Sequence, residues 1–483
     1  MIVKKIYTII LSVSMAFMAI SCDITDVFSG EWLDINTNPN YVSEADMKML
    51  LPSAHLNLVT KVGYDLTLYG SFWSQYVVQC STTNQYYTIM TNDVTNETFQ
   101  APWSYLYTRV LPSLHEVIEK AEKADNASNY LVEAKTTLVY ALYLLTSLYD
   151  QVAYTEGYVT PSQTPKFDSG KDMQATLISL LEEIRSMDAA QAAADEVLNT
   201  TVSSDMFFKG DTDAWFQFAN TLYLKVLMRD FNANKSKIES LLAENDFLES
   251  DAAFDNFSDA ASKSSPLYES DRRQLNTTNN IRCCSDVLNV LDASDPRLYY
   301  YYDNNPGGVV AGSEYGLAGD PTETSRLALS PTDPVYIGTV DEALFLQAEA
   351  YARLNNAAKA QAAYEEAVAA AFERVGAFND GVAKADVEAF LAGPYAFTAG
   401  SVEDMVEQII NQKWAANVRC MPFESWFDIN RTGYPARGEV LTDSHGILAS
   451  GYPVRFIISK ASADYNPNSP TPAPVNEKMW WHK

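Results

Sequence analysis

The chain of 483 residues has few of the side chains on which metal sites and acid–base catalysis depend. Only 4 histidines and 5 cysteines are present, and the histidines are scattered without forming a ligand pair. No Walker, H-E-x-x-H, G-x-S-x-G or G-x-G-x-x-G pattern occurs, and the cysteine spacing fits no zinc or haem motif. The sequence therefore predicts no metal, no cofactor and no recognisable catalytic motif.

Four cysteines follow the N-terminal region, namely Cys80, Cys283, Cys284 and Cys420. Buried free thiols are the expected state of these residues. A Cys80–Cys420 or similar bridge is the alternative, and the sequence leaves it open.

Basic residues are also scarce, with 34 Lys and Arg against 62 Asp and Glu, which gives a formal net charge of −28. A chain this acidic repels phosphate backbones, so no nucleic-acid partner is expected. The same charge opposes direct docking of the folded surface onto anionic lipid.

Long apolar runs are missing apart from Ile6–Ile20, which follows Lys4 and Lys5. This run of 15 residues is too short to cross a hydrocarbon core of about 30 Å comfortably as a helix. Its layout is typical of a secretory signal peptide. Cys22, directly after Ser21, indicates a bacterial lipoprotein signal in which the thiol is acylated; ordinary secretion with an incidental cysteine is the alternative.

Three segments are therefore expected. Residues 1–21 are a signal peptide, residues 22–43 are a polar tether whose Cys22 carries acyl chains such as palmitate, and residues 44–483 form the folded domain. Each buried CH₂ of an acyl chain contributes about 0.8 kcal/mol, so several chains anchor firmly without a membrane-spanning helix.

The folded region reads mostly as helix. Met47, Leu50, Leu51 and Ala54 form the i, i+3, i+4, i+7 apolar stripe of a core-facing helix. Similar stripes occur near 104–123, 129–150, 171–188, 212–231, 341–354, 357–373 and 402–417. Pro112 predicts a kink or break in the first of these, and Ser128 and Asp211 are the expected N-caps of the second and fourth.

One helical pair has the spacing of a tetratricopeptide repeat. Its small and aromatic positions are Ala348, Tyr351, Ala360, Tyr364 and Ala367. An ordinary alanine-rich hairpin is the alternative, and residues 129–150 and 171–188 are a weaker candidate for a further pair. Residues 255–335, rich in Ser, Asn, Asp, Pro and Gly, predict a long ordered loop insertion because aromatics are interspersed.

The segment 409–435 carries the most specific pattern in the chain. Its key positions are Glu424, Trp426, Phe427, Asp428, Arg431 and Gly433. They match, position by position, the Glu-x-x-W-F-D-x-x-R-T-G segment of the SusD/RagB family of Bacteroidetes outer-membrane lipoproteins, which the chain resembles. Further similarities at 33–40, 342–351, 453–456 and 480–481 follow in the family's order.

This resemblance implies a mostly α, tetratricopeptide-like scaffold of helical pairs with long ordered loop insertions. It also implies a non-catalytic receptor for a glycan or other nutrient, including peptide, that is lipid-anchored in the outer membrane and faces the cell exterior. The implied partner is a SusC-like TonB-dependent transporter. A surface glycoside hydrolase and a purely structural or adhesive lipoprotein are the alternatives; no pair among the 62 acids is singled out for hydrolysis.

The motif itself is expected to be structural. Asp428 and Arg431 lie three residues apart, so they reach each other on one helical turn and form an ion pair. Trp426 and Phe427 offer large apolar area to the core, and Glu424 is assigned to the same structural motif.

Ligand binding requires an exposed arc of aromatics flanked by polar groups, and two clusters are candidates. The candidate residues are Trp73, Tyr76, Asn84, Tyr86, Tyr87 and Trp103 in the first cluster, and Tyr300 and Tyr302 in the second. Core packing is the alternative for each of them. If they bind ligand, Trp73→Ala with Tyr86→Ala is expected to weaken binding while the thermal midpoint hardly changes.

Overall fold

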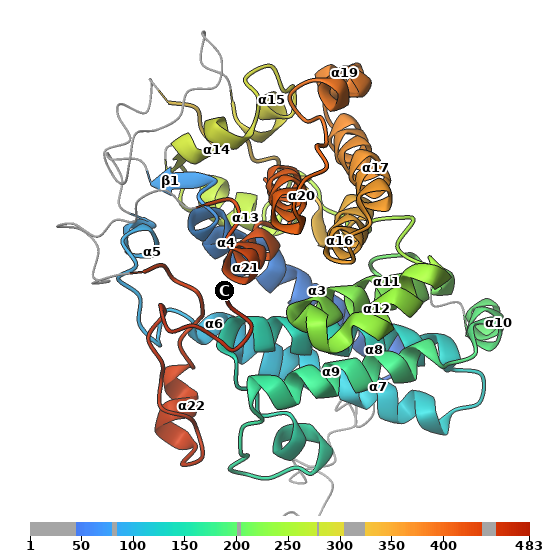
Figure 1. Cartoon of the computed structure of the whole chain (residues 1–483). Coiled ribbons are helices and arrows are strands. Elements are labelled where there is room, and N and C mark those ends of the chain that lie inside the picture. Colours follow the sequence, from blue (N-terminus) through green and yellow to red (C-terminus); the bar gives the residue numbers. More distant parts are fainter. Residues whose placement is uncertain (1–44, 80–84, 200–203, 278–279, 304–323, 437–450) are drawn as a thin grey trace, which may run out of the picture. The chain divides into compact units, whose positions relative to one another are not determined.

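The computed structural model describes residues 45–79, 85–199, 204–277, 280–303, 324–436 and 451–483 (Figure 1). Residues 47–483 belong to one compact unit. The predicted signal peptide, Cys22, the tether and Cys80 lie outside the described residues, so their assignments stay predictions. Within the described residues Cys283, Cys284 and Cys420 are buried free thiols, as expected.

Helices dominate the chain. The longer ones are α3 (Met47–Lys61), α7 (Leu111–Lys123), α8 (Ser128–Tyr149), α9 (Gly170–Arg185), α10 (Ala189–Asn199), α11 (Thr212–Leu227), α12 (Phe231–Glu244), α16 (Val340–Arg353), α17 (Ala357–Gly376), α20 (Val402–Ala416) and α21 (Pro422–Thr432). Shorter helices are α4 (Thr67–Trp73), α5 (Tyr87–Met90), α6 (Gln100–Tyr105), α13 (Pro266–Tyr268), α14 (Ser285–Val290), α15 (Leu298–Tyr301), α18 (Asp380–Ala383), α19 (Val387–Ala392) and α22 (Lys460–Tyr465). π-Helical turns are η2 (Val62–Leu66), η3 (Leu106–Val110), η4 (Thr155–Val159) and η7 (Glu269–Gln274), and η6 (Met228–Asp230) is a 3₁₀ turn.

The predicted insertion is ordered over its described residues and is held to the helices by two small sheets. β1 (Val77–Gln79) pairs antiparallel with β3 (Ile281–Cys283). β2 (Ala252–Phe254) pairs antiparallel with β4 (Val335–Gly338), which leads directly into α16.

The repeat-like hairpin is confirmed. Helices α16 and α17 pack against each other, and Ala348, Ala360 and Ala367 are fully buried at their contact. Asn355 makes the turn with a positive φ of 58°, a conformation that Asn adopts more easily than most residues.

The sequence patterns located helix boundaries well, with one exception. Asp211 caps α11 by accepting a hydrogen bond from the Ala214 amide, and Pro112 stands in the first turn of α7, directly after π-helical η3. Ser128 is not the cap of α8 but its first residue, so that prediction was wrong. Its amide instead donates to Asp195 Oδ2 of α10 at 2.9 Å, so a distant carboxylate satisfies this helix end.

Helix α8 is the central element of the packing. It contacts α7, α9 and α11, and most of its side chains are buried. By length and composition α8 could cross a membrane, but 89% of its most apolar window is buried inside the fold. Burial of this kind identifies α8 as a core helix.

Helices α4 and α21, which are far apart in the sequence, pack closely against each other (Figure 1). Gly70 of α4 makes this possible, because a Cβ at that position would lie 2.3 Å from the Phe423 amide nitrogen. Helix α21 thereby packs directly against α4.

His55 of α3 is a buried neutral imidazole. Its Nδ1 accepts from the Met206 amide at 3.4 Å, so Nε2 carries the proton and lies 3.2 Å from Thr137 Oγ1. Burial lowers the pKa of His55 to about 4, against the raising effect of Asp205.

This pKa predicts acid sensitivity. Between pH 6.5 and about 4 the unfolded chain binds a proton at His55 that the folded protein does not, so stability falls as the pH falls through this window. We expect wild type to lose about 2–3 kcal/mol more than His55→Gln between pH 7 and 4.5 in urea unfolding. Equal losses in the two proteins would refute this role for His55.

Candidate functional site

The predicted motif residues lie in α21, where they form part of a buried ion network. Lys225 of α11 pairs with Glu342 at 2.8 Å and with Glu424 at 3.1 Å. Lys413 of α20 pairs with Glu342 at 3.5 Å and with Asp428 at 2.8 Å. The side chains of these five residues are at most 10% exposed.

Arg431 extends the network to α16. It bonds Asp428 at 2.7 Å, as the spacing predicted, and binds both oxygens of Glu349 at 2.6 and 2.7 Å. Arg353 adds a 2.7 Å bond to Glu349 Oε1. The network thus alternates four cations with four carboxylates and ties α11, α16, α20 and α21 together.

The network shifts the pKa values of its members in the directions expected for buried pairs. The Arg431 and Arg353 guanidiniums overcome burial and hold the pKa of Glu349 well below its usual range. Burial raises the pKa of Glu424, although Lys225 opposes the rise. Each charge of the network is paired within the fold, which supports the structural role predicted for the motif.

The first predicted aromatic cluster lies in the core. Trp73 is 5% exposed, and its ring centroid lies 4.9 Å from that of Trp426 and 5.7 Å from that of Phe456. Tyr86 donates from its buried hydroxyl to Asp271 Oδ1 at 2.9 Å. Trp103 is also buried, with its centroid 4.8 Å from that of Tyr149.

Residues of the two predicted aromatic clusters contact each other, but they do so inside the core and not at an exposed surface. Tyr302 donates from its hydroxyl to the Tyr76 carbonyl at 2.9 Å, and both residues are buried. The Tyr76 hydroxyl in turn donates to the Trp414 carbonyl at 2.5 Å and lies 2.8 Å from Ser425 Oγ of α21. The prediction of an exposed aromatic arc was therefore wrong for five residues, because their rings are buried within the fold. They are Trp73, Tyr76, Tyr86, Trp103 and Tyr302.

Tyr87 and Tyr300 are the described candidates that keep some exposure. Tyr87 is half-buried at the start of α5. Tyr300 stacks beside exposed Phe378 with ring centroids 5.9 Å apart, and the Arg419 guanidinium lies 4.1 Å from its centroid. Asn84 lies outside the described residues, so its role and those of Tyr87 and Tyr300 stay predictions.

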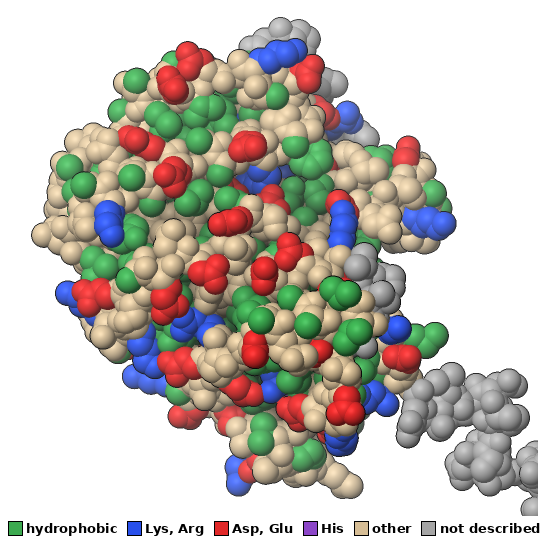
Figure 2. Space-filling model, turned by 90° about the vertical axis from the view of Figure 1, so that its right-hand side faces the viewer, with side chains coloured by type: hydrophobic (Ala, Val, Ile, Leu, Met, Phe, Trp, Pro, Cys, Tyr) green, Lys and Arg blue, Asp and Glu red, His purple; other side chains and the backbone are tan. Residues whose placement is uncertain are grey.

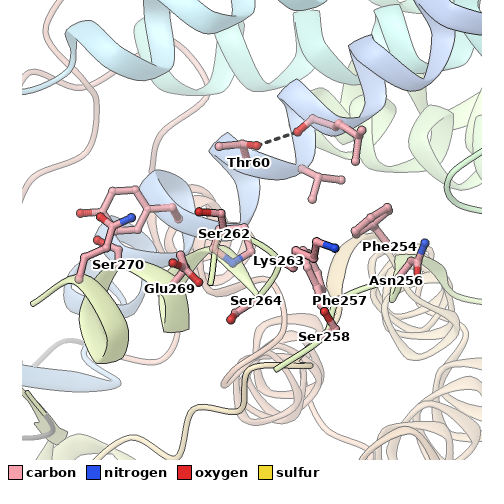
Figure 3. A pocket seen from close by; sticks show the side chains of 15 residues that line it. Thr60, Phe254, Asn256, Phe257, Ser258, Ser262, Lys263, Ser264, Glu269 and Ser270 are labelled. Carbon is pink, nitrogen blue, oxygen red and sulfur yellow. Dashed lines mark hydrogen bonds between the residues drawn. The ribbon is translucent and has the colours of Figure 1, made fainter. Parts of the chain in front are cut away.

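A cavity of about 690 Å³ lies elsewhere, between α3, η2 and the segment 254–274 (Figure 3). We call it the Phe257 cavity. Phe254 and Phe257 stand on one side of it, with ring centroids 4.8 Å apart, and Glu269 and Ser270 of η7 stand on the other. Its remaining lining residues are Leu56, Val59, Thr60, Tyr64, Asn256, Ser258, Ser262, Lys263, Ser264, Pro266 and Gln274.

This cavity combines the two surfaces that a sugar ring requires. Aromatic faces at Tyr64, Phe254 and Phe257 suit its C–H face, and amides, hydroxyls, Lys263 and Glu269 suit its hydroxyl groups. The volume falls within the range of small-molecule sites. The sequence alone did not single out this cavity, because its lining residues come from α3, η2 and the segment 254–274, which are far apart in the chain.

Metal binding has no support in the described part of the chain, where no group of three or more His, Cys, Asp or Glu side chains could hold an ion.

The comparisons with known proteins agree with this architecture. Residues 39–456 match the model of a SusD-like family described as starch-binding and associating with outer membrane. No match was found among curated protein sequences.

Solved structures share the fold. A SusD-like protein of Bacteroidetes is 21% identical with a TM-score of 0.73, and the match covers 91% of this chain and 100% of that one. A SusD homolog from Bacteroides uniformis is 20% identical with a TM-score of 0.72, over 90% of this chain and 99% of that one. A chitin-binding protein is 20% identical with a TM-score of 0.73, over 91% and 100%. With the family match across most of the chain, the Glu424–Gly433 motif and the helical-pair fold, the chain belongs to the SusD/RagB family of Bacteroidetes.

Proposed function

We propose that this protein captures a glycan at the cell surface and delivers it, uncleaved, to a SusC-like TonB-dependent transporter in the outer membrane. Starch and chitin oligosaccharides are the first candidates, because the family is described as starch-binding and one structural relative as chitin-binding. Acylation at Cys22 would hold the protein in the outer membrane, and residues 22–43 would serve as its tether.

The Phe257 cavity carries this proposal. It is the described cavity in which several aromatic rings face a set of neutral polar groups, and its exposed rim residues leave it accessible from solvent. Contacts of that kind favour sugar rings over fully apolar ligands.

A binding role without hydrolysis fits the acid content of this cavity. Glu269 is the one carboxylate among the described residues that line it, whereas glycosidases use two carboxyl groups on either side of the scissile bond. That carboxylate is paired with Arg273, whose Nε lies 3.5 Å from Glu269 Oε2.

The test is calorimetric titration of maltoheptaose and chitohexaose into wild type, Phe257→Ala and Tyr465→Ala. Phe257 is half-buried at the cavity, so its loss should weaken binding about tenfold, the equivalent of ~1.4 kcal/mol of stacking and apolar contact. Tyr465 is 85% exposed at the end of α22 and lines neither this cavity nor the basic one described below, so Tyr465→Ala is the matched aromatic control.

The same incubations should release no reducing ends. Binding that is unchanged in Phe257→Ala would remove the cavity from the proposal, and release of reducing ends by wild type would establish the hydrolase instead.

A further inference from the structure

A second cavity, of about 450 Å³, is lined by residues 480–483 and by Arg353 and Arg431 of the ion network. We call it the C-terminal cavity. Five of the described residues that line it are Lys or Arg and two are acidic. In a protein with a net charge of −28, whose surface in Figure 2 carries acidic side chains widely, such a basic cavity calls for an explanation.

Arg229 is the central cation of this cavity. It is 8% exposed and lies between two rings, with its guanidinium carbon 4.4 Å from the Tyr143 centroid and 4.7 Å from the Trp481 centroid. Its Nη2 donates to Ser147 Oγ, but its Nη1 is buried without a hydrogen-bond partner in the described part of the chain. A buried charged donor left in that state is costly, and an anion in the cavity would relieve the cost.

The ion network does not neutralise Arg229. Its four cations already pair with its four carboxylates, and no carboxylate of the described residues lies within 4 Å of the Arg229 guanidinium. Burial lowers the pKa of Arg229, although Tyr143 and Glu424 oppose the fall. A guanidinium nevertheless remains protonated in proteins, so Arg229 is a surplus buried positive charge.

Two further buried donors belong to residues that line the same cavity. The indole nitrogens of Trp480 and Trp481 are buried without a hydrogen-bond partner among the described residues. An indole N–H can only donate, so both groups require an acceptor. Lys171 adds a second charge, since it lines the cavity and its Nζ lies 5.9 Å from the Trp480 ring centroid.

The two acids of the cavity have other roles. Asp230 caps α12 by accepting from the Ala233 amide at 3.2 Å, and Glu403 lies 3.5 Å from the Lys483 amine. Neither acid supplies the acceptor that Arg229 and the indoles lack.

We propose that the C-terminal cavity binds an oxyanion, the carboxylate or sulfate group of an acidic sugar, with Arg229 as charged donor and the indole N–H groups of Trp480 and Trp481 as neutral donors. The oxyanion site follows from the cavity alone, and only the sugar as its source rests on the proposed function.

The test is calorimetric titration of the purified protein with sodium D-glucuronate, D-glucose, sodium sulfate and sodium acetate at constant ionic strength. Glucuronate and glucose differ by the carboxylate, and sulfate and acetate test a free anion as the source. The variants are Arg229→Gln, Trp480→Phe and Lys171→Gln. Lys235→Gln on α12 is the control, because Lys235 is exposed and lines neither cavity.

We expect glucuronate to bind about tenfold more tightly than glucose, and Arg229→Gln to raise its Kd about tenfold, as for loss of a charged hydrogen bond. Trp480→Phe and Lys171→Gln should raise the Kd about two- to fivefold, and Lys235→Gln should leave it unchanged. Should Arg229→Gln fail to fold, the other two cavity variants still decide the outcome.

Binding of sulfate or acetate without glucuronate would support the oxyanion site with a free anion as its occupant. Equal affinity for glucuronate and glucose, no binding of any of the three anions, or undiminished anion binding in the cavity variants would overturn the proposal. If the wild type binds the anions but neither maltoheptaose nor chitohexaose, the result would contradict the proposed function and leave the oxyanion site standing.

Discussion

Trp73→Ala should lower the free energy of unfolding by about 3–5 kcal/mol, the usual cost of removing a buried tryptophan. The residue is 5% exposed and lies among the rings of Tyr69, Phe99, Trp426 and Phe456. Its indole nitrogen also donates to the Ile89 carbonyl at 3.3 Å. Truncation therefore creates a cavity at the contact between α4 and α21 and leaves that carbonyl without its donor.

Equilibrium denaturant unfolding measures this loss, with Tyr299→Ala as the control. Tyr299 is 43% exposed, and surface substitutions of that kind usually change stability by less than ~0.5 kcal/mol. This result would reverse the expectation from the sequence that Trp73→Ala together with Tyr86→Ala leaves the thermal midpoint nearly unchanged. A loss below ~1 kcal/mol in Trp73→Ala would instead show that the side chain is not part of the core.

The sequence predicted what depends on neighbours along the chain. The Asp428–Arg431 pair follows from their separation by three residues in one helix, and the α16–α17 hairpin follows from small residues at repeat spacing. The Asp211 cap is equally local.

Features that depend on distant partners were not predictable in the same way. Whether Trp73 faces solvent depends on Trp426 and Phe456, more than 300 positions away along the chain. A mixture of aromatics and amides is typical both of a sugar site and of a core segment whose hydroxyls bond the backbone, as Tyr76 does. The Phe257 cavity likewise needs α3 and the segment 254–274 together, and neither segment alone indicates a site.

Lys225→Met should destabilise the protein by about 3–5 kcal/mol, because it leaves the buried carboxylates Glu342 and Glu424 without their shared cation. Glu342 keeps an ion pair with Lys413 at 3.5 Å, whereas Glu424 keeps no ion pair with a described residue and accepts from the Tyr143 hydroxyl at 2.8 Å. Glu424 is therefore the group that carries most of the penalty.

Neutralising that carboxylate should restore much of the loss. We expect the double variant Lys225→Met with Glu424→Gln to lose less free energy of unfolding than the two single variants lose together. The difference should be about 1–3 kcal/mol, as for residues that contact each other. Additive losses in this double-mutant cycle would show that the two side chains act independently.

The pH dependence of Lys225→Met separates a stranded charge from simple loss of packing. Burial already raises the pKa of Glu424 in the wild type, and Lys225 opposes that rise, so the variant should raise the pKa further. A carboxyl group whose folded pKa exceeds its unfolded value takes up its proton first in the folded protein, so stability is gained as the pH falls through the folded pKa. The deficit of Lys225→Met relative to wild type, measured by urea unfolding, should therefore shrink between pH 8 and 5. A deficit that stays constant over this range would assign the loss to packing and not to an uncompensated charge on Glu424.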